Sequence, residues 1–371
     1  MEKSGISSEG KMWDIIPFIT MFIIEGCTIA LTITAKSAMA IGMSQFVFVA
    51  YSNALSSILL LLYCLFYHRD SMKKVFNADL LTRFFLLGLT GITIAQNLAF
   101  TGLRDSSPIV VCAMGLLLPS FQFFLNLVLR KAQLKLKNKS TRIKIIGVLV
   151  SFIGATTVAV YLGPSILNGP IIGPIRFRLQ GSSKPFFIFI STTEEWMFGT
   201  FLLACATFFI AIWSMIQVST FTRFPDMMVI VTCYTIFGTI QTFFVDIIAN
   251  GDLNAWKLKW DLELLIIVLT AIFGTLVRSR IQAWIMGMKG PMYVAMFKPA
   301  GIFWANFFGE SFFGTLCYGS VIGTIVVGVG YYTVLWGVKE EAKKAQEYSV
   351  KPASSDIKTP LLQNQNGDEQ V

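Results

Sequence analysis

The chain has 371 residues and a formal net charge of +9, with 54% hydrophobic and 14% charged residues. A soluble domain carries about 25% charged residues, so this composition excludes a soluble globular protein. The excess of basic residues lies in short segments between apolar runs, where membrane topology accounts for it, and it does not indicate a nucleic-acid partner.

Ten apolar runs are long enough to cross a bilayer as helices, which predicts an all-α polytopic membrane protein. The expected spans lie near 13–34, 43–67, 84–103, 108–129, 145–163, 195–218, 227–249, 262–286, 291–313 and 317–337. An even number places both termini on one side, and most of the 30 Lys and Arg residues then fall on that side, which the positive-inside rule assigns to the cytosol. The expected organisation is a cytosolic N-terminal tail (1–12), a first repeat (13–163), a non-cytosolic loop (164–194), a second repeat (195–337) and a mobile cytosolic tail (338–371).

Glu25 lies near the centre of the first predicted span. A carboxylate within a membrane span is costly and is therefore a functional candidate. If it were unpaired it would take up a proton, because desolvation disfavours the charged form. Glu25 is thus a candidate for proton coupling or for binding a substrate amine; the alternative is a hydrogen bond that only locks two helices together.

Neutral polar side chains within the later spans form a second group of candidates, either as the lining of a solute cavity or as hydrogen bonds between helices. Gln96 and Gln282 stand out because they lie in the helices that precede two proline-containing helices. The whole group comprises Gln96, Asn97, Gln122, Ser214, Gln217, Gln282 and Asn306.

The ninth span combines a lysine, a proline and a carboxylate in one apolar run. Pro299 removes a backbone donor and is expected to break the helix where Lys298 lies. Lys298 is a candidate counter-ion for a substrate carboxylate, or for Glu25 in the empty state; the alternative is that it reaches the cytosolic surface. Glu310 lies near the outer end of this span, where it can face water. Arg278, at the predicted cytosolic end of the eighth span, is explained by topology alone.

The two halves of the chain resemble each other. Gly147 and Gly154 of the fifth span align with Gly323 and Gly330 of the tenth, and glycines seven residues apart share one helix face. The fourth and ninth spans each contain an internal proline, Pro119 and Pro299. Chance likeness between apolar helices is the alternative. A repeat of five spans must insert upside down in its second copy, and inverted repeats are typical of secondary transporters with a site at the bilayer midplane.

Four segments carry a resemblance to a known family: GMSQFVFVAYSNAL from Gly42, GLTGITIAQNLAFTGLRDSSP from Gly88, AWIMGMKGPMYVAMFKP from Ala283 and YGSVIGTIVVGVGYYTVLWGVKEE from Tyr318. They resemble the plant nodulin-21-like, UMAMIT or walls-are-thin transporters of the EamA-type branch of the drug/metabolite transporter superfamily. The resemblance implies ten helices in two inverted five-helix EamA-like repeats, and transport of amino acids or, in some relatives, auxin. Two positions depart from the family pattern: Leu116 replaces a common Asn, and Thr315 replaces a common acidic residue.

The chain shows no enzyme motif, and it implies neither a cofactor nor a metal; its single histidine, His68, has no apparent catalytic partner. The predicted function is a secondary transporter of small organic solutes, amino acids first. The alternatives are an auxin-like indole acid, a nucleotide sugar, or a role as a receptor or scaffold. The implied partners are a small-molecule substrate, a coupled proton and the lipid bilayer, and the sequence does not distinguish a monomer from a homo-oligomer. The plasma membrane is the expected location, with the tonoplast as the alternative.

Overall fold

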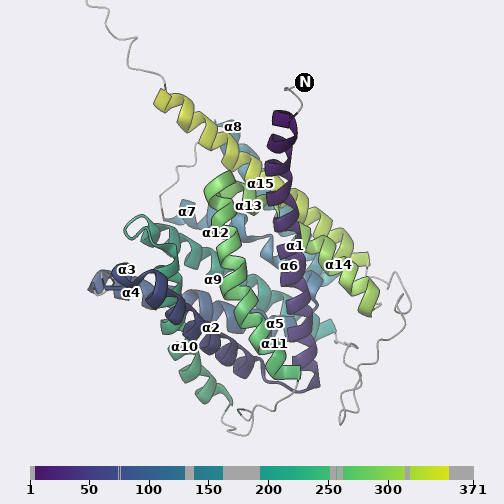
Figure 1. Ribbon diagram of the computed structural model, residues 1–371. Helices are drawn as coiled ribbons and strands as arrows, with labels where there is room; N and C mark the ends of the chain where they lie inside the picture. The colour runs from purple at the N-terminus through teal and green to yellow at the C-terminus, as the bar shows by residue number, and fades with distance from the viewer. Residues whose placement is uncertain are drawn as a thin grey trace, which may run out of the picture.

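The protein is described from a computed structural model, which covers residues 5–129 except 74 and 76, 138–161, 193–250, 256, 262–313 and 318–350. Within these ranges the regular secondary structure is helical throughout (Figure 1). The helices of the first half are α1 (Gly5–Ile41), α2 (Gln45–Tyr67), α3 (Arg69–Lys73), α4 (Ala78–Gly88), η1 (Leu89–Ile94), α5 (Ala95–Asp105), α6 (Pro108–Gly115), α7 (Leu118–Val128) and α8 (Lys139–Val160). Those of the second half are α9 (Thr193–Phe221), α10 (Met227–Asn250), α11 (Leu262–Ala271), η3 (Ile272–Val277), α12 (Arg278–Lys289), α13 (Pro291–Met296), α14 (Ala300–Phe313) and α15 (Tyr318–Val350).

Nine helical segments of the described chain are long and apolar enough to cross a membrane. They coincide with nine of the ten predicted spans, and the remaining one, 291–313, is occupied by the shorter helices α13 and α14. The all-α polytopic class predicted from the sequence is therefore confirmed. Several boundaries differ. α1 begins at Gly5, inside the expected N-terminal tail, and continues to Ile41. The third and fifth spans begin about six residues earlier than predicted, at Ala78 and Lys139, and the eighth continues to Lys289. α15 continues past the predicted end of the tenth span to Val350, into the expected tail. The expected loop at 164–192 and the tail beyond 350 lie outside the described residues.

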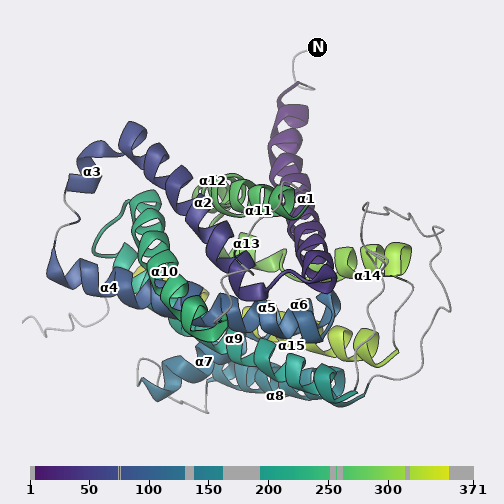
Figure 2. The same cartoon turned by 90° about the horizontal axis from the view of Figure 1, so that it is seen from below.

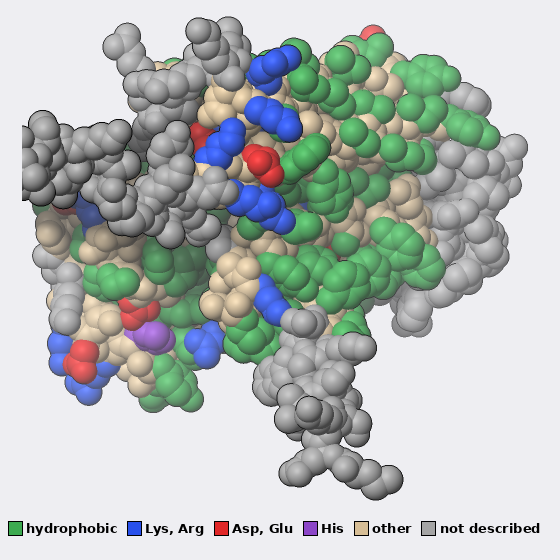
Figure 3. Space-filling model, turned by 90° about the horizontal axis from the view of Figure 1, so that it is seen from above, with side chains coloured by type: hydrophobic (Ala, Val, Ile, Leu, Met, Phe, Trp, Pro, Cys, Tyr) green, Lys and Arg blue, Asp and Glu red, His purple; other side chains and the backbone are tan. Residues whose placement is uncertain are grey.

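The beginning of α1 and the yellow end of α15 lie on the same side of the helix bundle (Figure 1). An even number of crossings produces this arrangement. The face on that side carries a gathering of Lys and Arg side chains (Figure 3), which is the charge distribution that the positive-inside rule associates with the cytosolic face.

α8 and α15 run antiparallel along one edge of the bundle, side by side in Figure 2. A Cβ added to Gly147 would lie 3.0 Å from the carbonyl oxygen of Gly330, and one added to Gly154 would lie 2.9 Å from that of Gly323. In the sequence alignment Gly147 corresponds to Gly323 and Gly154 to Gly330, but in space Gly147 faces Gly330 and Gly154 faces Gly323. A reciprocal contact of this kind requires a two-fold relation between the two helices, as expected for an inverted repeat.

Two local distortions also recur in both halves. The third span of each half contains a π-helical turn, η1 in the first half and η3 in the second, each with a glycine as its third residue. The fourth span of each half is interrupted, between α6 and α7 near Pro119 and between α13 and α14 at Pro299. The predicted proline breaks are therefore present, and π-turns such as η1 and η3 often accompany functional sites.

α2 and α10 join the two halves through polar pairs along an antiparallel contact. Cys64 Sγ lies 2.9 Å from Thr232 Oγ1, and Ser57 Oγ lies 2.7 Å from Thr239 Oγ1. Hydrogen bonds between side chains are a common means of holding membrane helices together.

Candidate functional site

Glu25 of α1 is the centre of a small cluster of charged residues at mid-span. Its side chain is buried, and its Oε1 accepts a hydrogen bond from Lys298 Nζ at 3.2 Å. Arg278 Nη2 lies 4.0 Å from the same oxygen. The carboxylate therefore faces two cations, one from the proline break and one from α12.

The two cations are more accessible than the carboxylate. The side chain of Lys298 is 36% exposed and that of Arg278 is 26% exposed, whereas that of Glu25 is 5% exposed. Positive charge is thus the more exposed part of this cluster.

Gly26 allows α14 to approach α1 closely beside Glu25. A Cβ on Gly26 would lie 2.6 Å from Cε2 of Trp304, so the indole ring occupies the space that any larger residue would need. Trp304 Nε1 also donates a hydrogen bond to the carbonyl oxygen of Phe22 at 2.9 Å. This contact holds the helix that follows the proline break against the helix that carries the carboxylate.

The proline break is a tight turn, and the carbonyl groups that lose their helical donors there accept hydrogen bonds from α15. Ala300 N bonds to Phe297 O at 2.9 Å, so the carbonyl of Met296 loses its helical donor, and Pro299 has no N–H to give to Ala295. Tyr331 donates its hydroxyl to Ala295 O at 2.6 Å, and Tyr332 donates to Met296 O at 3.1 Å. The break that presents Lys298 is therefore fixed by α15 and does not offer these carbonyls to a solute.

An apolar cluster lies on each side of Glu25 along α1. One turn before it, Met21 is fully buried against Ile285 and Phe297. One turn after it, Ile29 packs with Ile109 and Ala305 in a second buried cluster. Glu25 thus lies between two apolar clusters along α1, about halfway through its span.

Of the charged candidates in the sequence, the structure brings Glu25 and Lys298 together and does not describe the side chain of Glu310. Sequence reasoning missed Arg278, because it ended the eighth span at 286 and treated the arginine as part of its cytosolic end. The helix continues to Lys289, so Arg278 lies well inside the span. A signal was present in the apolar residues 284–288, WIMGM, which follow Arg278 and show that the apolar run continues beyond it.

The neutral polar candidates mostly bond to neighbouring helices or to their own. Gln96 accepts a hydrogen bond from Asn53 at 2.7 Å, and Gln122 donates to Ser214 at 2.8 Å. Asn97 donates to the carbonyl of Thr93 at 2.9 Å, while its own Oδ1 is buried without a hydrogen-bond partner. Gln217 and Gln282 are half-buried on α9 and α12. The structure brings none of these residues into the charged cluster around Glu25.

The two departures from the family pattern are placed differently. Leu116 is buried in the break between α6 and α7, where it belongs to an apolar cluster with Val158 and Tyr331. Thr315 lies outside the described residues.

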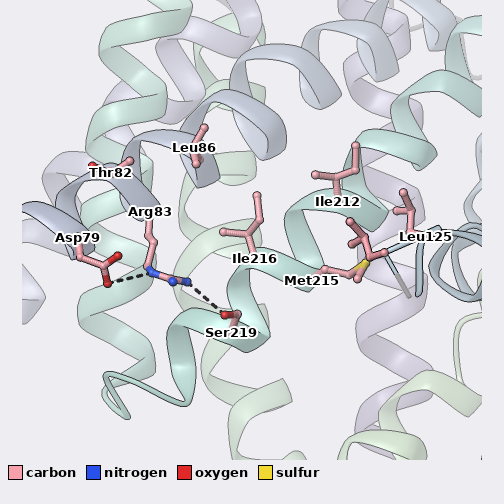
Figure 4. A pocket seen from close by; sticks show the side chains of 10 residues that line it. Asp79, Thr82, Arg83, Leu86, Leu125, Ile212, Met215, Ile216 and Ser219 are labelled. Carbon is pink, nitrogen blue, oxygen red and sulfur yellow. Dashed lines mark hydrogen bonds and ion pairs between the residues drawn. The ribbon is translucent and has the colours of Figure 1, made fainter. Parts of the chain in front are cut away.

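A separate groove of about 360 Å³ opens between α4, α7 and α9 (Figure 4). Its charged end is Arg83, which donates to Asp79 Oδ2 and to Ser219 Oγ, both at 3.2 Å. Leu125, Ile212 and other apolar side chains line the rest. The groove contains none of the site residues predicted from the sequence, so it is not the midplane site.

Comparisons with known proteins give a consistent result. The chain is 43% identical to WAT1-related protein At1g70260 of Arabidopsis thaliana, over 95% of this chain and 96% of the relative. It is also 43% identical to WAT1-related protein At1g60050 of the same plant, over 96% of this chain and 97% of the relative. The chain also resembles a protein of known crystal structure, with a TM-score of 0.50 and 14% sequence identity. The match spans 87% of this chain and 99% of the other, and it shows a likeness of fold alone. No family model matches the chain.

Proposed function

The chain belongs to the WAT1-related family of plant membrane proteins, and from this premise we propose that it is a secondary carrier of small organic solutes. The observation that carries the proposal is the Glu25–Lys298–Arg278 cluster at mid-span, between two apolar layers. Charged residues within a membrane span are costly and mark solute or ion pathways. In carriers built from inverted repeats, the solute site lies at the midplane between the repeats.

The charges of the cluster favour a solute that carries a carboxylate. One carboxylate faces two cations, so the cluster carries one positive charge in excess in surroundings that disfavour an uncompensated charge. A solute carboxylate that reaches Lys298 or Arg278 neutralises that charge, and a planar guanidinium suits a carboxylate well. Amino acids, the first candidates from the sequence, supply such a group.

A monoanion such as an indole acid is the second candidate, and one observation favours it. The ammonium group of an amino acid needs an acceptor, whereas the single carboxylate of the cluster is already shared by two cations. An indole acid has no ammonium and leaves the Glu25 contacts in place. A nucleotide sugar carries two phosphate charges, which exceed the one positive charge that the cluster offers.

The proposal is tested with the full chain in proteoliposomes, by uptake of radiolabelled glutamine, indole-3-acetate and a nucleotide sugar. We expect flux of the first or second probe, and we expect Lys298→Met to reduce it by at least tenfold. Lys344→Met is the matched control, because Lys344 is exposed near the end of α15 and bonds only to Asn138 among the described residues. Absence of flux for all three probes, with the protein folded, would favour the receptor or scaffold alternative.

Glu25→Gln is the companion variant. It leaves two cations without their carboxylate, and removal of one partner from a buried ion pair costs roughly 3–5 kcal/mol, a figure that the partial exposure of the cations reduces. We expect impaired flux together with a lower unfolding temperature. Unchanged flux at every pH would remove Glu25 from the mechanism.

We propose the plasma membrane as the location, with the tonoplast as the alternative, and both termini in the cytosol. The orientation is supported by the basic residues on the face where α1 begins and α15 ends (Figure 3). Accessibility labelling of cysteines introduced at each terminus, in intact and permeabilised cells, tests the orientation. Co-localisation of a fluorescent fusion with membrane markers tests the compartment.

A further inference from the structure

Asp246, near the end of α10, is a buried carboxyl group that does not belong to the charged cluster around Glu25. Its side chain is 0% exposed, and neither carboxylate oxygen has a hydrogen-bond partner among the residues that the structure describes. It lies within the apolar span Met227–Ile248. Glu25 shows the opposite situation, because its carboxylate interacts with two cations.

The helices packed against α10 bring no charge to Asp246. α2 contains no Asp, Glu, Lys, Arg or His, and η1 contains none either. α4 carries Asp79 and Arg83, which bond to each other, and α9 begins with Glu194 and Glu195. No charged group among the described residues interacts with Asp246.

An aromatic group covers the same end of the α2–α10 contact. The antiparallel register that pairs Cys64 with Thr232 and Ser57 with Thr239 places Asp246 opposite Ala50, beside Tyr51. The Tyr51 hydroxyl donates to Trp256 O at 2.9 Å, and the ring of Trp256 packs 5.0 Å from that of Phe243. Tyr51, Phe243 and Trp256 thus form an aromatic cap at the end of α10 where Asp246 lies.

An ionised carboxylate without a partner is very costly in apolar surroundings, whereas a protonated carboxyl is a neutral group that costs far less to bury. Asp246 can therefore remain buried in its neutral form and can lose its proton only when water reaches it. A residue that changes protonation with exposure is what a proton-coupled carrier requires.

We propose that Asp246 is the proton-binding residue that couples transport to a pH gradient, and that Glu25 is not. This inference rests on the proposed carrier function. One proton from water binds the carboxylate when water reaches Asp246, is carried while Asp246 is buried, and returns to water when water reaches it again. Glu25 takes no part in this step, because its carboxylate is already held by Lys298 and Arg278.

The test separates net uptake driven by a pH gradient from exchange. Proteoliposomes containing the full chain are assayed with radiolabelled glutamine and indole-3-acetate, with and without an acidic exterior, and for counterflow against the unlabelled solute at equal pH. We expect the gradient to stimulate wild-type uptake several-fold. In Asp246→Asn, which mimics the neutral carboxyl in shape, we expect no stimulation, with counterflow kept within about twofold. Asp226→Asn, a change at the other end of the same helix, is the matched control and keeps the stimulation.

The outcomes are distinguishable. Stimulation that persists in Asp246→Asn overturns the inference, as does wild-type counterflow without any effect of the gradient, and both leave the carrier function standing. Absence of wild-type counterflow defeats the carrier function and the coupling role together.

Infrared difference spectroscopy of wild type against Asp246→Asn gives a readout that needs no transport. We expect loss of the carbonyl band of a protonated carboxyl group, and loss of a carboxylate band in its place would overturn the inference. Should the Asn variant fail to fold, Asp246→Glu gives the complementary test: it retains a carboxyl group and is expected to keep both the band and gradient-driven uptake, and loss of gradient-driven uptake with the band retained would overturn the inference.

Discussion

The two halves of the molecule share their backbone devices but differ in the charges placed on them. Each half has a π-turn in its third span and a break in its fourth. After η3 comes Arg278, and in the second break lies Lys298, whereas η1 is followed by Ala95 and the first break holds Leu116 and Leu117. The repeated backbone thus provides a scaffold, and the departure from symmetry creates the charged site.

The carboxylate that completes this site comes from the other half. Glu25 belongs to α1, and the two cations that it faces belong to the second half. The cluster therefore lies where the halves meet. A relative movement of the halves changes the contacts of Glu25 directly, which suits alternating access.

The largest effect is expected when a charge is placed in the break of the first half, which is apolar in the native chain. Leu116→Lys puts an ammonium into a buried apolar cluster, at a cost of roughly 2.5–3.5 kcal/mol on insertion scales in addition to the lost packing of the leucine. We expect little folded protein by fluorescence-detected size-exclusion chromatography. Leu116→Met, which keeps the volume and apolar character, is the control. Normal yield of the lysine variant would mean that the first break is not a dry, apolar site.

The seam between α8 and α15 tests the symmetric part of the comparison. A Cβ on Gly330 would lie 2.5 Å from the backbone nitrogen of Ser151, which cannot move aside as a flexible side chain can. Gly330→Ala is therefore expected to lower stability by about 1–3 kcal/mol through overpacking. Gly328, two residues earlier on the same helix, has nothing within 4 Å of a Cβ. Gly328→Ala is the matched control.

Thermal unfolding in detergent measures both variants. We expect Gly328→Ala to be neutral or slightly stabilising, because alanine is the better helix former. Equal unfolding temperatures for the two variants would contradict the close contact of the two helices.

The sequence carried much of this architecture because the relevant signals are local. Apolar runs define the spans, the prolines locate the breaks, and the spacing of Gly147 and Gly154 identifies the seam. Glu25 and Lys298 could be selected because each is a charge inside an apolar run. Arg278 and Asp246 were not selected in the same way, because Arg278 was assigned to the cytosolic end of the eighth span and Asp246 lies near the predicted end of the seventh, where a charge is ordinary. Only tertiary packing shows that Arg278 reaches Glu25 and that Asp246 has no partner.

A smaller effect is expected at the tyrosines that hold the second break. Tyr331→Phe removes the hydrogen bond to Ala295 O, which costs about 0.5–1.5 kcal/mol. The loss is moderated because Lys298 N also donates to that carbonyl, at 3.2 Å. We expect a modest decrease in unfolding temperature together with a change in the apparent affinity for the transported probe, because Lys298 gains freedom. Thr333→Val, at a half-buried position of the same helix whose hydroxyl bonds within that helix, is the control and should change neither value.

The weakest effect concerns the polar contact between the halves, at the end of α2 and the start of α10. His68 Nδ1 lies 2.8 Å from Asp226 Oδ2. Burial alone would raise the pKa of Asp226, but hydrogen bonds from His68 and Ser71 outweigh it and hold that pKa below its ordinary value of 3.8. A carboxyl group whose pKa is lowered by folding stabilises the fold above its unfolded pKa, and this contribution is lost as the pH falls through the folded value.

We therefore expect Asp226→Asn to lower stability at neutral pH by about 0.2–1 kcal/mol, as for a partly exposed pair. The difference from wild type should persist down to the ordinary pKa of 3.8 and then shrink toward zero. Asp70→Asn is the control, because its pair with Lys73 is exposed on both sides and contributes little. A difference that grows as the solution becomes more acidic would show that the Asp226 carboxylate does not stabilise this contact.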